Sequence, residues 1–142
     1  MKKFYAFLIT LVIGATANAQ IINMPDANFK AMLLSTSYLN QRASVNFPDS
    51  SGIVLADSYV VIDANNDGQI QLSEAAFIKV LKLNVCSIET PFVDLTGIEA
   101  FNNVIYLNIS CNNIINVNLN NPPLRYVECQ NDNFQLADFV SE

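Results

Sequence analysis

Apolar residues follow different spacings in successive parts of this chain of 142 residues. Residues 4–15 form an unbroken apolar run. Further along, Phe29, Met32 and Leu33 recur at the i, i+3 and i+4 spacing of one helical face. A proline and an aspartate at residues 25–26 suit the first turn of a helix, so a short helix is predicted to begin there and to face a core.

From Lys79 onward apolar and polar residues alternate, which is typical of strands. Three segments align with one another, at residues 80–85, 104–109 and 124–129, with offsets of 24 and then 20 residues. Periods of about 20–29 residues indicate leucine-rich repeats, which stack as parallel strands. The marker positions of the middle copy are Val104, Leu107, Ile109, Asn112 and Ile114. The amide of Asn112 is expected to satisfy backbone groups where the chain turns out of the strand.

Side chains between the inward apolar positions should line the other face of these strands. The candidate binding residues on this face are Tyr106, Asn108, Tyr126, Glu128 and Gln130. Tyr106 and Tyr126 are expected to stand side by side on neighbouring strands. They form either part of a binding surface or a cross-strand packing pair, and the sequence leaves both interpretations open.

Residues 63–74 match the pattern of an EF-hand calcium loop. Oxygen-bearing side chains stand at alternate positions, Gly68 permits a sharp turn, and Ile70 anchors the loop to the core. The expected ligands are Asp63, Asn65, Asp67, Gln69 through its carbonyl, Gln71 and Glu74. The alternative is a polar turn that needs no ion.

A single calcium loop in an exported protein predicts weak affinity, with a dissociation constant on the order of 0.1–1 mM. Calcium at extracellular concentrations would largely fill such a site. The ion is therefore expected to be structural rather than a signal, and to stabilise the fold by ordering the loop.

The N-terminus has the layout of a secretory signal peptide. Lys2 and Lys3 precede the apolar run of residues 4–15, and an Ala-x-Ala motif for cleavage follows at residues 17–19. The run is shorter than the ~20 residues that span a bilayer. We expect a secreted or cell-surface protein without integral membrane association in the mature chain, and a retained anchor is the alternative.

Charge and composition exclude several classes of function. The chain has 7 basic and 13 acidic residues, and loss of Lys2 and Lys3 with the signal peptide would leave a net charge of −8. An acidic surface repels phosphate backbones, so no nucleic-acid partner is expected. The absence of histidine excludes Ser-His-Asp and Cys-His catalysis and zinc sites built on imidazole, but it leaves carboxylate-pair and metal-water chemistry open. We do not expect an enzyme, and a metal-dependent hydrolase is the alternative.

Three cysteines are too few, and odd in number, for a disulfide-dense scaffold. Cys86, Cys111 and Cys129 are interpreted first as small apolar residues that fill the repeat core. A bridge between Cys86 and Cys111 is the alternative, because spacing alone does not set disulfide geometry.

Several motifs together resemble secreted leucine-rich-repeat proteins of Bacteroidetes-type bacteria, with internalin-like repeats. They are PDANF at residues 25–29, the loop at residues 63–74, LTGIE at residues 95–99 and LNISCN at residues 107–112. The resemblance implies extracellular binding or adhesion to a protein or glycan, carries over the calcium ligands and carries over no catalytic residue. The alternative function is a dockerin-like module for calcium-dependent assembly, although dockerins have two such loops and we find one here.

The expected fold is therefore α+β. Residues 1–19 are a signal peptide, residues 20–78 a small helical cap with the EF-hand-type loop, and residues 79–142 a short leucine-rich-repeat solenoid of parallel strands. The last part holds about two and a half repeats. Whether it is a truncated piece of a longer repeat protein is left open.

Overall fold

The computed structural model describes residues 20–47, 58–86, 90–115, 117–120 and 123–130. The predicted signal peptide and residues 131–142 lie outside the described residues. The helical elements are α1 (Ala27–Leu34), α2 (Leu72–Ala75) and the 3-10 turn η2 (Ile98–Ala100). The strands are β1 (Ala43–Ser44), β2 (Val80–Lys82), β3 (Tyr106–Asn108) and β4 (Tyr126–Glu128).

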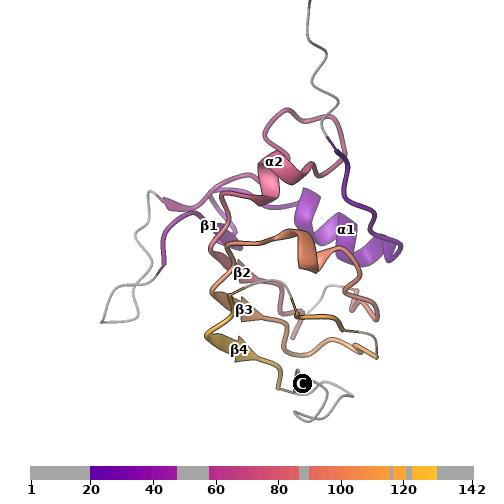
Figure 1. The fold of residues 1–142 in the computed structure, drawn as a ribbon. Coiled ribbons are helices and arrows are strands. Elements are labelled where there is room, and N and C mark those ends of the chain that lie inside the picture. The colour runs from indigo at the N-terminus through magenta and orange to yellow at the C-terminus, as the bar shows by residue number, and fades with distance from the viewer. Residues whose placement is uncertain (1–19, 48–57, 87–89, 116, 121–122, 131–142) are drawn as a thin grey trace, which may run out of the picture.

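The four strands form one mixed sheet in the order β1-β2-β3-β4 (Figure 1). β1 runs antiparallel to β2, with Ala43 opposite Leu81. The other three strands are parallel, and Leu81, Leu107 and Val127 lie in register across them. The three alternating segments of the sequence therefore lie side by side, each as a strand of three residues.

The predicted helical cap followed by a leucine-rich-repeat solenoid is wrong. The sheet is mixed, because β1 pairs with β2 in the antiparallel direction, and it does not curl. Lys79 N–H donates to the carbonyl of Ser44 at 2.8 Å, and Lys82 N–H donates to the carbonyl of Arg42 at 2.7 Å. The repeat pattern in the sequence predicts only the three parallel strands. It does not predict β1, a strand of two residues from an earlier part of the chain.

The helical part and the sheet share one core instead of forming a cap and a separate stack. Phe29 and Leu33 from α1 are fully buried, as are Leu81 and Leu107 from the sheet. The Phe29 ring packs against Phe92, with ring centroids 5.4 Å apart. Each such side chain stabilises the fold by roughly 1.5–3 kcal/mol relative to exposure.

Helix α1 forms where its sequence pattern predicts. Asp26 is its N-cap, and its carboxylate accepts hydrogen bonds from the backbone N–H groups of Asn28 and Phe29. The predicted stripe of Phe29, Met32 and Leu33 is buried. Within the described part of the chain, no helix is both long and apolar enough to cross a membrane.

Asn112 is buried at the turn after β3, and its amide satisfies backbone groups as predicted. Its Nδ2 donates to the carbonyls of Ile109 at 2.7 Å and Leu83 at 3.0 Å. Its Oδ1 accepts from the N–H of Phe92 at 3.3 Å. One side chain therefore joins three segments of backbone and satisfies a polar group in each of them.

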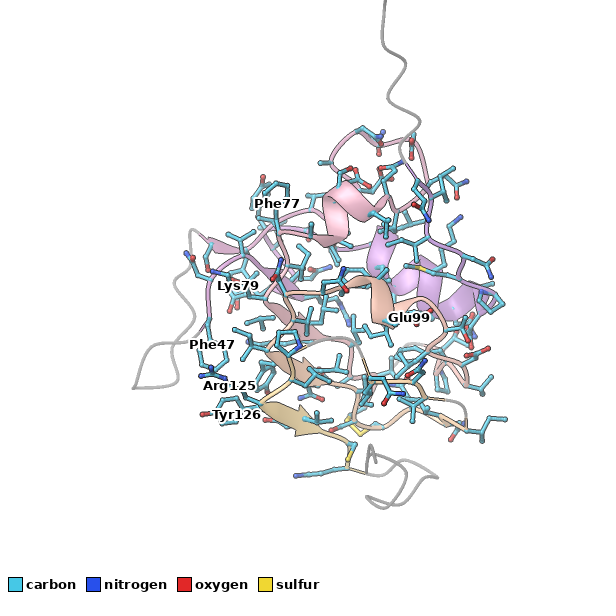
Figure 2. The ribbon with its side chains drawn as sticks, in the orientation of Figure 1. Phe47, Phe77, Lys79, Glu99, Arg125 and Tyr126 are labelled. Atoms are coloured by element: carbon cyan, nitrogen blue, oxygen red, sulfur yellow. A yellow bond between two sulfur atoms is a disulfide. The ribbon has the colours of Figure 1, made fainter. Side chains whose placement is uncertain are left out.

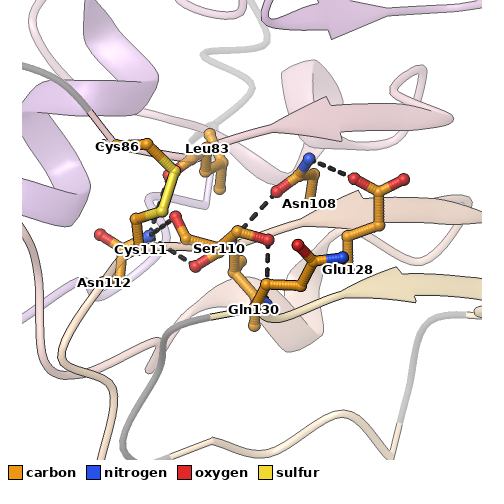
Figure 3. Close-up of a disulfide and its surroundings, with 9 residues drawn as sticks. Leu83, Cys86, Asn108, Ser110, Cys111, Asn112, Glu128 and Gln130 are labelled. Atoms are coloured by element: carbon orange, nitrogen blue, oxygen red, sulfur yellow. Dashed lines mark hydrogen bonds between the residues drawn. A yellow bond between two sulfur atoms is a disulfide. The ribbon is translucent and has the colours of Figure 1, made fainter.

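Cys86 and Cys111 form a disulfide, with their Cα atoms 5.0 Å apart (Figure 3). Cys86 is exposed, so the first interpretation of these two residues as apolar core fillers is wrong and the alternative bridge is confirmed. Cys129 is half-buried and packs against the core, as a filler would.

Candidate functional site

The loop at residues 63–74 is held together from its first side chain. Asp63 is buried, and its two carboxylate oxygens accept from the N–H groups of Asp67 at 3.1 Å and Gly68 at 3.0 Å. Gly68 has φ +75° and Asn66 has φ +57°, so the chain turns twice through the left-handed region. These turns fold the middle of the loop back over Asp63.

Glu74 closes the loop from its other end. Its Oε1 accepts from the N–H of Ala64 at 2.9 Å, and its Oε2 accepts from the N–H of Gln71 at 3.0 Å. Glu74 is the third residue of α2 and forms a capping box with Gln71, the N-cap. The start of helix α2 therefore fixes a carboxylate beside the beginning of the loop.

The remaining polar side chains of the loop form hydrogen bonds with one another. Asp67 Oδ2 accepts from the amide nitrogens of Asn65 at 3.0 Å and Gln71 at 2.7 Å. The amide oxygen of Gln71 also accepts from Asn65 at 3.4 Å. Rotation of each amide by half a turn would present oxygen in place of nitrogen, and the two orientations differ little in shape.

Gln69 differs from the other predicted ligands. Its side chain points to helix α1, where Oε1 accepts from Lys30 Nζ at 2.6 Å. This leaves its backbone carbonyl as the group that could face an ion, in agreement with the role that the loop pattern gives it.

The loop fits a hard cation through its donor chemistry. Five of the six predicted ligands have side chains linked through hydrogen bonds within the loop, and each of their carboxylate oxygens has further lone pairs. Among the described residues, no three carboxylate or thiol side chains gather closely enough to hold a metal by themselves. Calcium would therefore need the amide oxygens of Asn65 and Gln71 in addition to the three acids.

The predicted binding residues of the sheet lie together on β3, β4 and the residues that follow them (Figure 3). Asn108 Nδ2 donates to Glu128 Oε2 at 2.5 Å across the two strands. The N–H of Gln130 donates to Ser110 Oγ at 3.1 Å. Glu128 and Gln130 are exposed, which leaves their polar ends open to a ligand.

Tyr106 belongs to the same network. Burial raises the pKa of Tyr106, and a hydrogen bond to the negatively charged Glu128 carboxylate raises it further, to about 12. The phenol therefore stays protonated at neutral pH and acts as a hydrogen-bond donor beside Glu128.

Tyr126 stacks on a residue that the sequence did not single out. Its ring lies 5.6 Å from that of Phe47, at an interplanar angle of 26°. Figure 2 places Phe47 and Arg125 beside Tyr126 along one edge of the molecule. Phe47 comes from the segment after β1, so no local spacing could have indicated this contact. Tyr126 remains 54% exposed, so the stacking leaves much of its ring accessible.

The sheet also carries a cation above an aromatic ring. Lys82 Nζ lies 5.7 Å from the centroid of the Tyr59 ring and 3.5 Å from its hydroxyl. Tyr59 comes from the segment before the loop, and its contact with β2 was likewise not visible in the sequence.

Comparisons with known proteins add no relative: no protein-family model matches the chain, and neither a curated protein nor a solved structure does. The resemblance to secreted leucine-rich-repeat proteins therefore stays a prediction. Function has to be argued from the residues of this chain.

Proposed function

We propose that this chain is an exported binding protein that uses calcium as a structural ion. The observation that carries the proposal is the loop at residues 63–74, in which Asp63 holds the middle of the loop and Glu74 holds its beginning and the start of α2 through backbone hydrogen bonds. The signal-peptide pattern supports export. The bridge between Cys86 and Cys111 supports it too, because disulfides persist mainly in oxidising compartments.

The residues that would hold calcium are Asp63, Asn65, Asp67, the carbonyl of Gln69, Gln71 and Glu74. The bound ion would supply positive charge that offsets most of the negative charge of the three carboxylates in this loop. Free calcium at about ten times its dissociation constant would stabilise the fold by about 1.4 kcal/mol. That gain is modest, and it suits an ion that supports structure in a calcium-rich medium.

The binding surface in this proposal is the polar face that carries Tyr106, Asn108, Tyr126, Glu128 and Gln130. It offers an exposed aromatic ring beside amide and carboxylate groups, which is the kind of surface that contacts a protein or a glycan. The chain contains no histidine, and the proposal assigns no reaction to it.

The metal part is tested with the chain that signal-peptide cleavage would leave, residues 20–142. Isothermal titration should show one calcium ion bound, and the melting temperature should be higher in calcium than in chelator. Glu74→Gln keeps the size of the side chain but removes its charge, so both effects should be lost. Glu99→Gln, on η2 outside the loop, is the matched control and should keep both. Equal melting in calcium and chelator for the unaltered chain would refute the metal site.

The binding part is tested on a panel of extracellular glycans and purified surface proteins. Binding to a member of the panel should weaken in Tyr126→Ser and Gln130→Ala, which remove exposed groups from the face. Thr96→Ala, which lies away from the sheet, should bind as the unaltered chain does. Equal binding by the unaltered chain and both face variants would show that the partner contacts another surface.

A further inference from the structure

The loop at residues 63–74 pairs with the first described residues of the chain through an isolated β-bridge. The N–H of Ile22 donates to the carbonyl of Ile70 at 2.8 Å, and the N–H of Leu72 donates to the carbonyl of Gln20 at 2.9 Å. Ile21 forms an antiparallel bridge with Gln71 between these two bonds. Figure 1 shows this N-terminal segment, in indigo, beside the loop that leads to α2.

This pairing reaches the predicted ligands directly. Gln71 stands between Ile70 and Leu72, whose backbones are both hydrogen-bonded to the N-terminal segment. The N–H of Gln71 donates to Glu74 Oε2, so the position of Gln71 also sets that of the closing carboxylate. Loss of the N-terminal pairing would free the part of the loop where Gln71 and Glu74 are held.

The N-terminal segment is also fixed on its other side. Ile22 and Met24 are buried in the core. Gly97 lies so close that a Cβ there would be 2.8 Å from the carbonyl oxygen of Asn23. The segment is therefore clamped between the core and the metal loop, and its position is not set by the loop alone.

We propose that residues 20–22 support the calcium site, so that their pairing with the loop and calcium binding strengthen each other. This inference rests on the proposed calcium site. Among the described residues no second loop of this kind pairs with residues 63–74, and the N-terminal segment takes that place through two backbone hydrogen bonds. Because the coupling between two equilibria is reciprocal, calcium must tighten the pairing by the same factor by which the pairing tightens calcium.

The first test compares calcium titrations of the chain 20–142 and three variants. Ile22→Pro removes the N–H that donates to Ile70, and calcium affinity should fall about tenfold or more as the pairing is lost. Ile22→Ala keeps this N–H and removes the buried side chain. Comparison of the two variants therefore separates the loss of the hydrogen bond from the loss of packing. Leu39→Ala alters an exposed apolar residue outside both the N-terminal segment and the loop, and it should bind nearly as the unaltered chain does.

The second test avoids variants, which could fail to fold. Amide hydrogen exchange of the unaltered chain is measured with and without calcium. Calcium should slow exchange at Ile22 and Leu72 more than at Arg125, whose N–H bonds to Ile105 far from the loop. Equal slowing at all three amides, or unchanged affinity in folded Ile22→Pro, would overturn the coupling while leaving the calcium site intact. If the unaltered chain binds no calcium, the proposed function fails first, and both proposals fall with it.

Discussion

Asn112 provides the sharpest test of how this fold is held together. The substitution Asn112→Leu keeps the branching of the side chain at Cγ, makes it somewhat bulkier and removes its amide. The carbonyls of Leu83 and Ile109 would lose their donor, and the N–H of Phe92 would lose its acceptor. Asn112 is 1% exposed, so water cannot replace these partners without opening the core.

The cost follows from the number of orphaned groups. A buried polar group without a partner costs about 1–3 kcal/mol. The N–H bond at 3.3 Å is long, and burial of the leucine side chain offsets part of the loss. We expect a net destabilisation of about 2–4 kcal/mol, which is a large share of the ~5–15 kcal/mol that stabilises a typical domain. The melting temperature should fall by about 8–16 °C.

The assay is urea unfolding followed by circular dichroism, at one fixed calcium concentration so that the state of the loop at residues 63–74 does not vary. Asn84→Leu makes the same replacement at an exposed position after β2, and it should change the free energy of unfolding by less than about 0.5 kcal/mol. If Asn112→Leu unfolds at the same urea concentration as Asn84→Leu, the amide does not hold the three segments together, and the reasoning fails.

Three further predictions concern other contacts. Gly97→Ala should destabilise the fold by about 1–3 kcal/mol in urea unfolding, because the new Cβ meets backbone at a φ of +105°; a neutral effect would contradict the clamp. Burial opposes ionisation of Asp26, but four backbone N–H groups outweigh it and lower its pKa below 3.8. The unaltered chain should therefore be more stable than Asp26→Asn by its full margin above that pH, and the margin should shrink as the pH falls through the lowered pKa. If urea unfolding gives the same difference in free energy between the two proteins at neutral and acidic pH, this prediction is refuted. The pKa of Tyr106 is raised in the folded chain, so its protonated phenol contributes to the stability of the fold. This contribution is full below pH 10 and is lost as the pH rises towards 12. Glu128→Gln should lower this pKa in an ultraviolet tyrosinate titration, and an unchanged pKa would rule out the contact.

The parts of the structure that follow from short-range pattern could be predicted from the sequence. Helix α1 has its cap and its apolar stripe within ten residues of one another, and both are where the spacing places them. The turn of the loop also depends on neighbours in sequence, since Gly68 and the side chain of Asp63 are five residues apart. Contacts between residues close in sequence determine these features, so contacts with residues far away in the sequence change them little.

The arrangement of the sheet depends on contacts that no local pattern records. β1 has two residues, Ala43 and Ser44, and both are buried because β2 lies on one side and Tyr59 bridges to Ser44 on the other. A strand this short has no visible alternation. The parallel segments could be aligned by their spacing, but the antiparallel edge that makes the sheet mixed could not.

The size of the polar face limits what it can bind by itself. The face spans β3, β4 and the two residues after each of these strands, so at ~3.3 Å per residue and ~4.8 Å between strands it covers a patch about 16 Å by 5 Å. A stable protein complex buries about 800 Å² on each partner, several times the area of this patch. A short glycan or an extended peptide matches it, whereas a protein partner must also contact the surface beside the strands. Phe47, already stacked on Tyr126, and the neighbouring Arg125 are the first such residues, so Arg125→Ala should weaken a protein partner more than a glycan.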